Sequence, residues 1–146
     1  MPLVAANLIS DWRRALMSEL KTAYPAAEVR AGRRTGVSRD LVRIHVFSDG
    51  YQEVADRVVV ANPVMLIRFW PDRSKLPDSQ PLDPTQLEQA MVDVMKLLQD
   101  RQEQIERSVD DLWYFRVQSA LIDEDPDEWG VEFRLLGFAK NVAAVA

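Results

Sequence analysis

The sequence predicts an α+β domain in which a mostly antiparallel sheet carries two helices packed on one face. Two segments, 3–23 and 84–105, repeat apolar residues every three or four positions, which is typical of amphipathic helices. Shorter runs that alternate in polarity or are rich in β-branched residues predict strands. These runs lie at 27–34, 41–47, 57–61, 64–70, 112–122 and 129–139. The expected order is therefore α-β-β-β(-β)-α-β-β, with most strands joined as hairpins.

The two helices have different boundary signals. The apolar stripe of the first consists of Ala5, Ile9, Trp12, Leu16, Leu20 and Ala23. Pro25 ends this helix because the residue before a proline avoids helical dihedral angles. The second helix has the clearer start: Asp83 is a capping residue, Pro84 suits the first helical position, and Gln86 has the spacing of a capping box. Its apolar stripe consists of Leu87, Met91, Val94, Met95 and Leu98.

The strands after the first helix are punctuated by turn residues. Segment 41–47 alternates, which places Val42, Ile44 and Val46 on one face and Arg43 and His45 on the other. The following residues, 48–50, have the composition of a turn. Residues 62–63 are Asn-Pro and separate the runs 57–61 and 64–70, so we expect a bent strand or a hairpin there.

The last two runs predict a long antiparallel hairpin that ends the fold. In segment 112–122, alternation puts Trp113, Phe115, Val117 and Leu121 on one face. In segment 129–139, it puts Val131, Phe133 and Leu135 on one face and Glu132 and Arg134 on the other. The connection between the two runs, 123–128, is an acidic turn.

We expect a single domain over residues 1–146 with two irregular segments. Four prolines fall within residues 71–84, so the segment 71–83 is predicted to be an exposed loop, and long loops in compact domains are usually functional or mobile. Residues 141–146 are small and apolar and are predicted to form a short flexible tail. The charged residues Asp11, Arg13 and Arg14 interrupt the N-terminal apolar stretch, which argues against a signal peptide.

The composition excludes several classes of function. The chain has no cysteine, which excludes disulfides, thiolate zinc sites and thiol nucleophiles. One histidine leaves no room for a site with several histidine ligands. The net charge of −5 argues against tight non-specific binding to nucleic acid. No apolar run reaches the roughly 20 residues of a membrane-spanning helix, so no membrane partner is expected.

The acidic turn offers a first candidate site. Its acidic residues are Asp123, Glu124, Asp125, Asp127 and Glu128. Calcium binds several oxygen ligands, but the turn lacks the spacing, the central glycine and the distal glutamate of a calcium loop. A solvated hairpin tip is therefore the favoured interpretation, and no metal site is predicted.

An arginine-rich segment is the second candidate. The arginines are Arg30, Arg33, Arg34, Arg39 and Arg43. Three interpretations remain open: a solvated face, a contact with an acidic protein surface, or a contact with nucleic-acid phosphates. The acidic net charge weighs against the last.

No arrangement of residues predicts catalysis. His45 is interpreted as a surface or interface histidine, because no nucleophile or orienting acid accompanies it. Gly32 and Gly36 do not form a phosphate loop, since the Gly-Lys-Ser/Thr ending is missing. The chain is therefore expected not to be an enzyme and to need no cofactor.

Taken together, the element order and the final hairpin resemble the tail terminator proteins of long-tailed, siphovirus-type bacteriophages. The likeness covers nearly the whole chain. It begins with an N-terminal amphipathic helix and an arginine-rich early strand, and it continues with an apolar sheet, a proline-rich loop and a second helix. An aromatic hairpin follows, which reads Leu112-Trp113-Tyr114-Phe115-Arg116-Val117 and Trp129-Gly130-Val131-Glu132-Phe133-Arg134-Leu135-Leu136-Gly137-Phe138.

This resemblance implies a structural virion protein of the tail or neck, assembled in the cytoplasm of the host bacterium. Tail terminators form a ring, typically a homohexamer, on the head-proximal end of the tail tube. The implied partners are further copies of the chain, the major tail tube protein and the head–tail connector protein, with DNA only as passing cargo. The ring stops tube polymerisation and joins the tail to the head. The family has no catalytic residues to carry over.

A closed ring needs two different complementary patches on each subunit. The arginine-rich segment 30–43 and the acidic turn 123–128 are candidates for such a pair. Two alternatives stay open. One is another phage neck protein, either a tail completion or a head–tail connector protein. The other is a small cellular α+β module that binds a ligand or RNA, for which Tyr114, Phe138, Arg116 and Arg134 resemble an aromatic and basic sheet surface.

Overall fold

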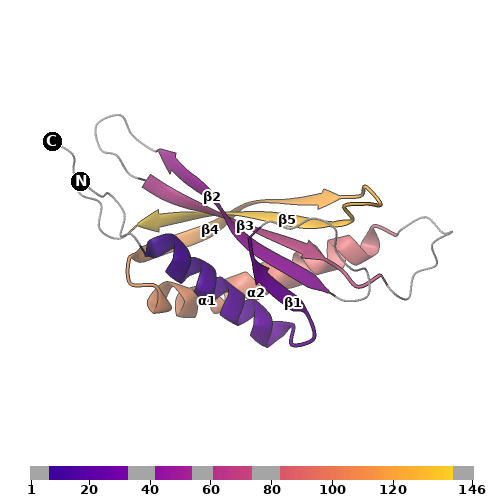
Figure 1. Ribbon diagram of the computed structural model, residues 1–146, viewed down its shortest axis with the longest axis horizontal. Coiled ribbons are helices and arrows are strands. Elements are labelled where there is room, and N and C mark those ends of the chain that lie inside the picture. The colour runs from indigo at the N-terminus through magenta and orange to yellow at the C-terminus, as the bar shows by residue number, and fades with distance from the viewer. Residues whose placement is uncertain (1–6, 33–41, 54–60, 74–82, 140–146) are drawn as a thin grey trace.

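The computed structural model describes residues 7–32, 42–53, 61–73 and 83–139. Within these ranges the chain forms two helices and one five-stranded sheet (Figure 1). The elements are α1 (Leu8–Ala23), β1 (Glu28–Ala31), β2 (Arg43–Glu53), β3 (Ala61–Trp70), α2 (Thr85–Ser108), β4 (Leu112–Asp123) and β5 (Gly130–Ala139). The predicted α+β class and the order α-β-β-β-α-β-β are confirmed. The predicted loop 71–83 lies outside the described residues except at its ends, and so does the tail 141–146.

The sheet is open and mostly antiparallel, with the strand order β1-β2-β3-β5-β4. The pairs β2–β3, β3–β5 and β5–β4 are antiparallel. The edge strand β1 is the exception, because it runs parallel to β2, with Glu28 opposite Arg43 and Arg30 opposite His45. The sequence predicted hairpin connections and did not anticipate this parallel pair.

Both helices contact the sheet and lie on the same side of it in Figure 1, where they also contact each other. From α1, the side chains of Leu8, Trp12, Leu16 and Leu20 are buried, which confirms the centre of the predicted stripe. Ile9 is half-buried and Ala23 is exposed, and Ala5 lies outside the described residues. Strands β2, β3 and β5 contribute apolar residues to the same core. This side is called the helix-covered face below. It holds Ile44, Val46, Met65, Ile67, Phe69, Val131, Phe133 and Leu135.

Trp12 marks the centre of this core. Its side chain is fully buried, and its ring lies 5.8 Å from the ring of Phe115, measured between centroids. Gly137 permits the close approach of β5 to this indole, because a Cβ atom at Gly137 would lie 2.9 Å from the ring atom Cζ3. Helix α1 and strands β4 and β5 are thus joined through one large side chain.

The predicted turn at 48–50 is wrong. Strand β2 continues through these residues, and its pairing with β3 is irregular between Ser48 and Tyr51. Gly50 has a φ of +84°, and its N–H donates to the hydroxyl of Ser48. A glycine in the left-handed region lets a strand absorb an irregularity without ending, so turn residues here mark a bulge.

Strand β3 runs unbroken through the Asn-Pro pair, which removes the hairpin alternative at that point. The registered partner of Pro63 is Tyr51, the first pair after the irregular part of β2. A proline lacks the N–H that a regular ladder requires, so a site beside an interruption of the ladder tolerates it. The expected strand 57–61 lies outside the described residues apart from Ala61.

The start of α2 lies one residue later than predicted, because Pro84 is the N-cap and Thr85 is the first helical residue. The carboxylate of Asp83 accepts the N–H of Thr85 at 2.9 Å. Gln86 does not complete a capping box, because its side-chain amide donates to the carbonyl of Asp72 at 3.1 Å. This bond ties the beginning of α2 to the segment that follows β3.

Strand β4 does not keep the predicted face. The pairing with β5 shifts between Leu112 and Tyr114 and again between Val117 and Ser119. Each irregularity moves the alternation by one residue. Phe115 is buried in the core, whereas Trp113 is 66% exposed and Leu121 is 61% exposed. The prediction for β5 is confirmed, since Val131, Phe133 and Leu135 are buried while Glu132 and Arg134 are only half-buried.

Helix α2 covers the beginning of the free edge of β4. The side chain of Gln102 donates to the carbonyl of Phe115 at 2.7 Å, and the N–H of Phe115 donates to the carboxylate of Glu106 at 3.2 Å. Unpaired edge groups invite pairing with another chain, and here two side chains from one helix satisfy them. Among the described residues, neither helix is long and apolar enough to cross a membrane.

Candidate interaction surfaces

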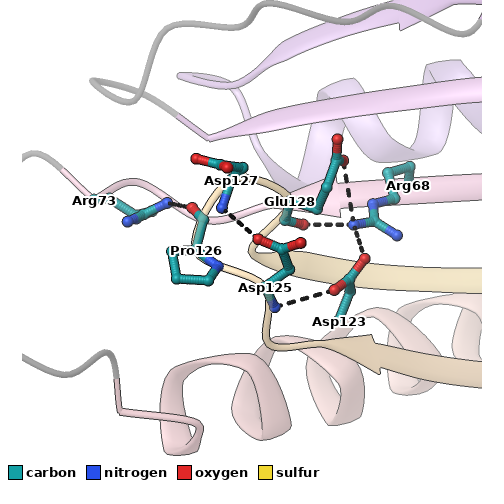
Figure 2. Close-up of polar contacts among 7 residues, drawn as sticks. All are labelled: Arg68, Arg73, Asp123, Asp125, Pro126, Asp127 and Glu128. Atoms are coloured by element: carbon teal, nitrogen blue, oxygen red, sulfur yellow. Dashed lines mark hydrogen bonds and ion pairs between the residues drawn. The ribbon is translucent and has the colours of Figure 1, made fainter.

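The acidic tip, residues 123–128, projects from the end of the β4–β5 hairpin and is anchored by arginines (Figure 2). The guanidinium of Arg68 lies 3.2 Å from the carboxylate of Asp123 and 3.8 Å from that of Glu128, and it also donates to the Glu128 carbonyl. Arg73 donates to the carbonyl of Pro126 at 2.6 Å. The tip therefore has a defined position relative to the end of β3.

Within the tip, carboxylates also serve the local backbone. The N–H of Asp125 donates to the side chain of Asp123 at 3.1 Å, and the N–H of Asp127 donates to the side chain of Asp125 at 3.0 Å. Glu124, Asp125, Asp127 and Glu128 are exposed. No group of three or more potential metal ligands comes together among the described residues. The tip thus presents an exposed, ordered and negatively charged protrusion.

Two of the five candidate arginines lie in the described ranges. Arg30 is exposed at the edge strand β1 and pairs with Glu28. Arg43 is only 4% exposed, and its guanidinium carbon lies 5.6 Å from the centroid of the Trp70 ring. Arg33, Arg34 and Arg39 lie outside the described residues. Of the expected arginine surface, the described residues therefore include one exposed arginine, Arg30, and one buried arginine, Arg43.

On the face of the sheet opposite the helices, three polar side chains pack around the ring of Trp70. Arg43 lies on one side of its ring, and the guanidinium carbon of Arg68 lies 5.4 Å from the ring centroid. His45 packs edge-on against the same ring at 4.8 Å between centroids. His45 is 1% exposed, so the surface alternative of its interpretation as a surface or interface histidine is wrong. Packing against the ring of Trp70 contributes to this burial, because β2 and β3 are neighbouring strands.

A cluster of aromatic rings, with Trp113 and Tyr114 exposed and Phe138 half-buried, lies at the other end of the hairpin from the acidic tip. Tyr114 lies 6.4 Å from Trp113 and 5.6 Å from Phe138, between ring centroids. The guanidinium carbon of Arg116 lies 5.9 Å from the Phe138 centroid. These four residues are called the aromatic surface. Aromatic and arginine side chains are the residue types that dominate binding energy at protein interfaces.

The sequence analysis missed a basic hollow on the solvent side of α1. It has a volume of about 370 Å³, and its described lining is formed by Ser10, Arg13, Arg14, Met17, Ser18 and Lys21. These positions repeat every three or four residues, opposite the buried stripe of the helix. The signal in the sequence is the presence of three cations, Arg13, Arg14 and Lys21, on one face of the helix.

Three resolved pKa shifts have structural causes. The N–H of Thr85 donates to the Asp83 carboxylate and holds its pKa below the usual value. The hydrogen bond and charge of Glu19 raise the pKa of Arg101, which bridges α1 and α2. Burial, followed by the charge of Asp93, raises the pKa of Tyr24. These shifts report a helix cap, an interhelical ion pair and a partly buried ring.

No protein-family model matches the chain, and no curated protein matches it either. The features that bear on function are therefore the fold and three surfaces: the acidic tip, the aromatic surface and the basic hollow.

Proposed function

We propose that the chain is a structural virion protein of the tail-terminator kind. In this role, several copies form a ring, with six as the expected number, on the head-proximal end of a phage tail tube. The ring stops tube polymerisation and presents a surface to the head–tail connector protein. Its partners are further copies of itself, the major tail tube protein and the connector, and DNA passes through it as cargo.

The observation that carries this proposal is the closing hairpin together with the helices that precede it. The order α-β-β-β-α-β-β matches the order on which the resemblance to tail terminators was based. The hairpin β4–β5 exposes contact-forming residues at both ends, the acidic tip and the aromatic surface. A subunit in a ring must contact two neighbours as well as the partners above and below it, and separate exposed surfaces favour such an arrangement.

The test is a capping assay on tail tubes. Tubes assembled from a major tail tube protein are mixed with the purified chain and imaged by negative-stain electron microscopy. We expect a ring at one end of each tube and tubes that no longer elongate when more tube protein is added. Tubes that keep growing and carry no ring at any protein concentration would exclude the terminator role. A ring that joins purified heads but does not stop tubes would favour another neck protein.

The aromatic surface supports a second candidate function, binding of single-stranded RNA on the sheet. Bases stack on exposed aromatic rings, and neighbouring arginines contact phosphates. Tyr114 and Phe138 lie on adjacent strands with Arg116 beside them. Fluorescence anisotropy with a labelled single-stranded RNA tests this. Binding that is lost in Tyr114→Ala and retained in a Val92→Ala control, on exposed α2, would favour the RNA-binding module over the virion protein.

A further inference from the structure

We infer that the open end of the β4–β5 hairpin docks on the exposed side of α1 in a second copy of this chain. The docking end is called the Trp113 end and consists of Asp110, Asp111, Trp113 and Tyr114. Its receptor is called the basic side of α1 and consists of Arg13, Arg14, Met17 and Lys21. The inference deepens the proposed ring by naming a contact between its subunits, and only the closure of the ring rests on the proposed function.

An irregularity of β4 turns Trp113 outward. The pairing of β4 with β5 passes directly from Leu112 to Tyr114, so Trp113 is an extra residue without a registered partner on β5. Bulges of this kind re-aim a side chain, and the indole of Trp113 is 66% exposed. The exposed ring of Tyr114 lies 6.4 Å away, between centroids. Exposed aromatic rings, tryptophan above all, supply much of the binding energy at protein interfaces.

Two carboxylates flank this ring. Asp110 and Asp111 are the central residues of a tight turn between α2 and β4, closed by the N–H of Leu112, which donates to the Val109 carbonyl at 3.1 Å. Within the described part of the chain, neither aspartate side chain forms a hydrogen bond or an ion pair. The negative end of the α2 dipole lies directly before them. The Trp113 end therefore attracts cations, through its carboxylates and through its ring faces.

The basic side of α1 has the complementary pattern, an apolar centre with cations around it. Met17 is half-buried. Three cations lie three or four positions from it on the same side of the helix: Arg13, Arg14 and Lys21. Arg13 and Lys21 form no ion pair or hydrogen bond with other described residues, and Arg14 forms one exposed ion pair, with Asp11 at 3.4 Å. A thioether packs well on an aromatic ring, and a guanidinium binds carboxylates in pairs of hydrogen bonds.

The two patches lie on different sides of the molecule, so they are not arranged to meet within one chain. Phe115 and Gly137 contact the ring of Trp12 on the helix-covered face. Their neighbours Tyr114 and Phe138 therefore lie on the opposite face. The basic side of α1 points to solvent, because the buried stripe of this helix faces the sheet. A contact between different patches is heterologous, and repeated head-to-tail contacts form a ring when the rotation closes.

The local charge favours a protein partner over nucleic acid at this end. Asp110 and Asp111 repel phosphate groups. Of the neighbouring cations, Arg107 is paired with Glu103, and the Arg116 guanidinium carbon lies 5.9 Å from the centroid of an aromatic ring, that of Phe138. The basic side of α1 supplies cations for the two aspartates, and these matched charges also fix the orientation of the contact.

The first experiment follows tryptophan fluorescence of the full chain over a wide range of concentrations. Trp113 is the exposed one of the four tryptophans. The other three are buried: Trp12, Trp70 and Trp129. Quenching by acrylamide therefore reports mainly on Trp113. As the chain associates, we expect quenching to fall and the emission to move to shorter wavelength. Trp113→Ser should show neither change.

Sedimentation velocity on the same samples measures the association itself. Two variants disrupt one patch each, Asp110→Asn/Trp113→Ser at the hairpin and Arg13→Gln/Lys21→Gln on α1. All four side chains are exposed or half-buried, so thermal unfolding of each variant should be nearly unchanged. Each variant should associate at least about tenfold more weakly than the wild type, because an aromatic anchor or two cations are lost.

A matched control and a mixture sharpen this result. The control Val92→Ala/Lys96→Gln removes an apolar side chain and a cation from the exposed side of α2, and it should associate like the wild type. When the two disrupted variants are mixed, the intact Trp113 end of one meets the intact basic side of the other. The remaining patches no longer match, so we expect one-to-one dimers that do not grow further.

Charge reversal tests the pairing of the two patches directly. Asp110→Lys/Asp111→Lys should weaken association, and adding Arg13→Glu/Lys21→Glu should restore it in part, because the charges match again with opposite signs. Restoration by reversing arginines of the segment 30–43 instead would overturn the inference.

The remaining outcomes separate this contact from the other proposals. A wild type that stays monomeric at every concentration, or disrupted variants that associate as strongly as the wild type, would overturn the inference. Loss of binding to single-stranded RNA in the Asp110→Asn/Trp113→Ser variant, with self-association intact, would also overturn it and favour the RNA-binding module. Association through the two patches without capping of tail tubes would reject the proposed function alone.

Discussion

The two faces of the sheet bury very different side chains on the same strands. On the helix-covered face, β2 and β3 contribute apolar residues such as Ile44 and Ile67 to the core with α1 and α2. On the opposite face, the same strands bury Arg43 and His45 around Trp70. Burial on the first face is driven by removal of apolar surface from water, whereas the second face depends on ion pairs and contacts between cations and an aromatic ring.

This difference has a consequence for stability and for binding. Close-packed apolar cores lose much stability when a large side chain is truncated. Charged clusters that remain partly open to solvent contribute less and vary with salt. Arg68 nevertheless positions the acidic tip, because it binds Asp123 and Glu128 together. The helix-covered face is therefore expected to contribute most of the stability of the fold. The opposite face positions the acidic tip, which is a proposed contact surface.

The largest expected effect is at Trp12. Trp12→Ala removes a fully buried indole from the core and should lower the free energy of unfolding by about 3–5 kcal/mol. Trp113→Ala is the matched control, since Trp113 is mostly exposed, and it should change stability by less than about 0.5 kcal/mol. Urea unfolding followed by circular dichroism measures both. Equal losses would show that the exposed ring is also part of the stabilising core.

A second change adds atoms to the helix-covered face. Gly137→Ala should destabilise the protein by about 1–3 kcal/mol, because the new Cβ would meet the Trp12 ring. In a Trp12→Ala background the same change should cost clearly less, since the opposing ring is gone. The double-mutant cycle is read from urea unfolding. A cost that is the same in both backgrounds would mean that contact with the Pro63 ring or backbone effects, and not the indole, cause the loss.

The opposite face should respond more weakly. Arg68→Met removes the ion pairs with Asp123 and Glu128 and should lower stability by about 1–2 kcal/mol, since the guanidinium is mostly buried but both carboxylates are partly exposed. Arg14→Met, which breaks only the exposed pair with Asp11, should cost less than about 0.5 kcal/mol. Unfolding is measured at low and high salt, and high salt should reduce the loss caused by Arg68→Met because it screens the ion pairs. A loss that does not depend on salt would indicate that packing against Trp70 is responsible.

The smallest effect is expected at the start of α2 and depends on pH. The pKa of Asp83 is lowered in the folded chain by the N–H of Thr85. Its stabilising contribution is therefore present above the unfolded pKa and is lost as the pH falls through the lower folded pKa. The difference in melting temperature between the wild type and Asp83→Ala should shrink on acidification. In Asp83→Asn, which keeps an acceptor but does not titrate, the difference from Asp83→Ala should not follow pH in this way.

The elements of the fold were predictable from local patterns, with errors where a bulge intervened. The stripe Trp12, Leu16 and Leu20 predicted a helix and its buried side, and both are confirmed. Gly50 was read as part of a turn, although it sits at an irregularity inside β2. Two irregularities in β4 moved Trp113 and Leu121 away from the face of Phe115. A prediction from alternating polarity does not account for a bulge, because each inserted residue moves the following side chains to the other face of the sheet.

The candidate surfaces were predictable only in part. The acidic composition of the tip is a property of the sequence, but its anchoring by Arg68 joins residues 55 positions apart. The parallel pairing of β1 with β2 and the burial of His45 likewise depend on which strands are neighbours. The basic hollow lies on the polar side of one helix, so the spacing of Arg13, Arg14 and Lys21 in the sequence is already a signal for it.

The sequence alone determined the α+β class, the two amphipathic helices and the charge of the closing hairpin, because these follow from periodicity and composition along short stretches of chain. Only the tertiary structure decided that Arg43 and His45 are buried, that Trp113 is exposed, and that the basic hollow and the acidic tip face different sides of one molecule. The physical reason is that burial and proximity are set by neighbours distant in sequence, and those neighbours are fixed by strand order, register and bulges.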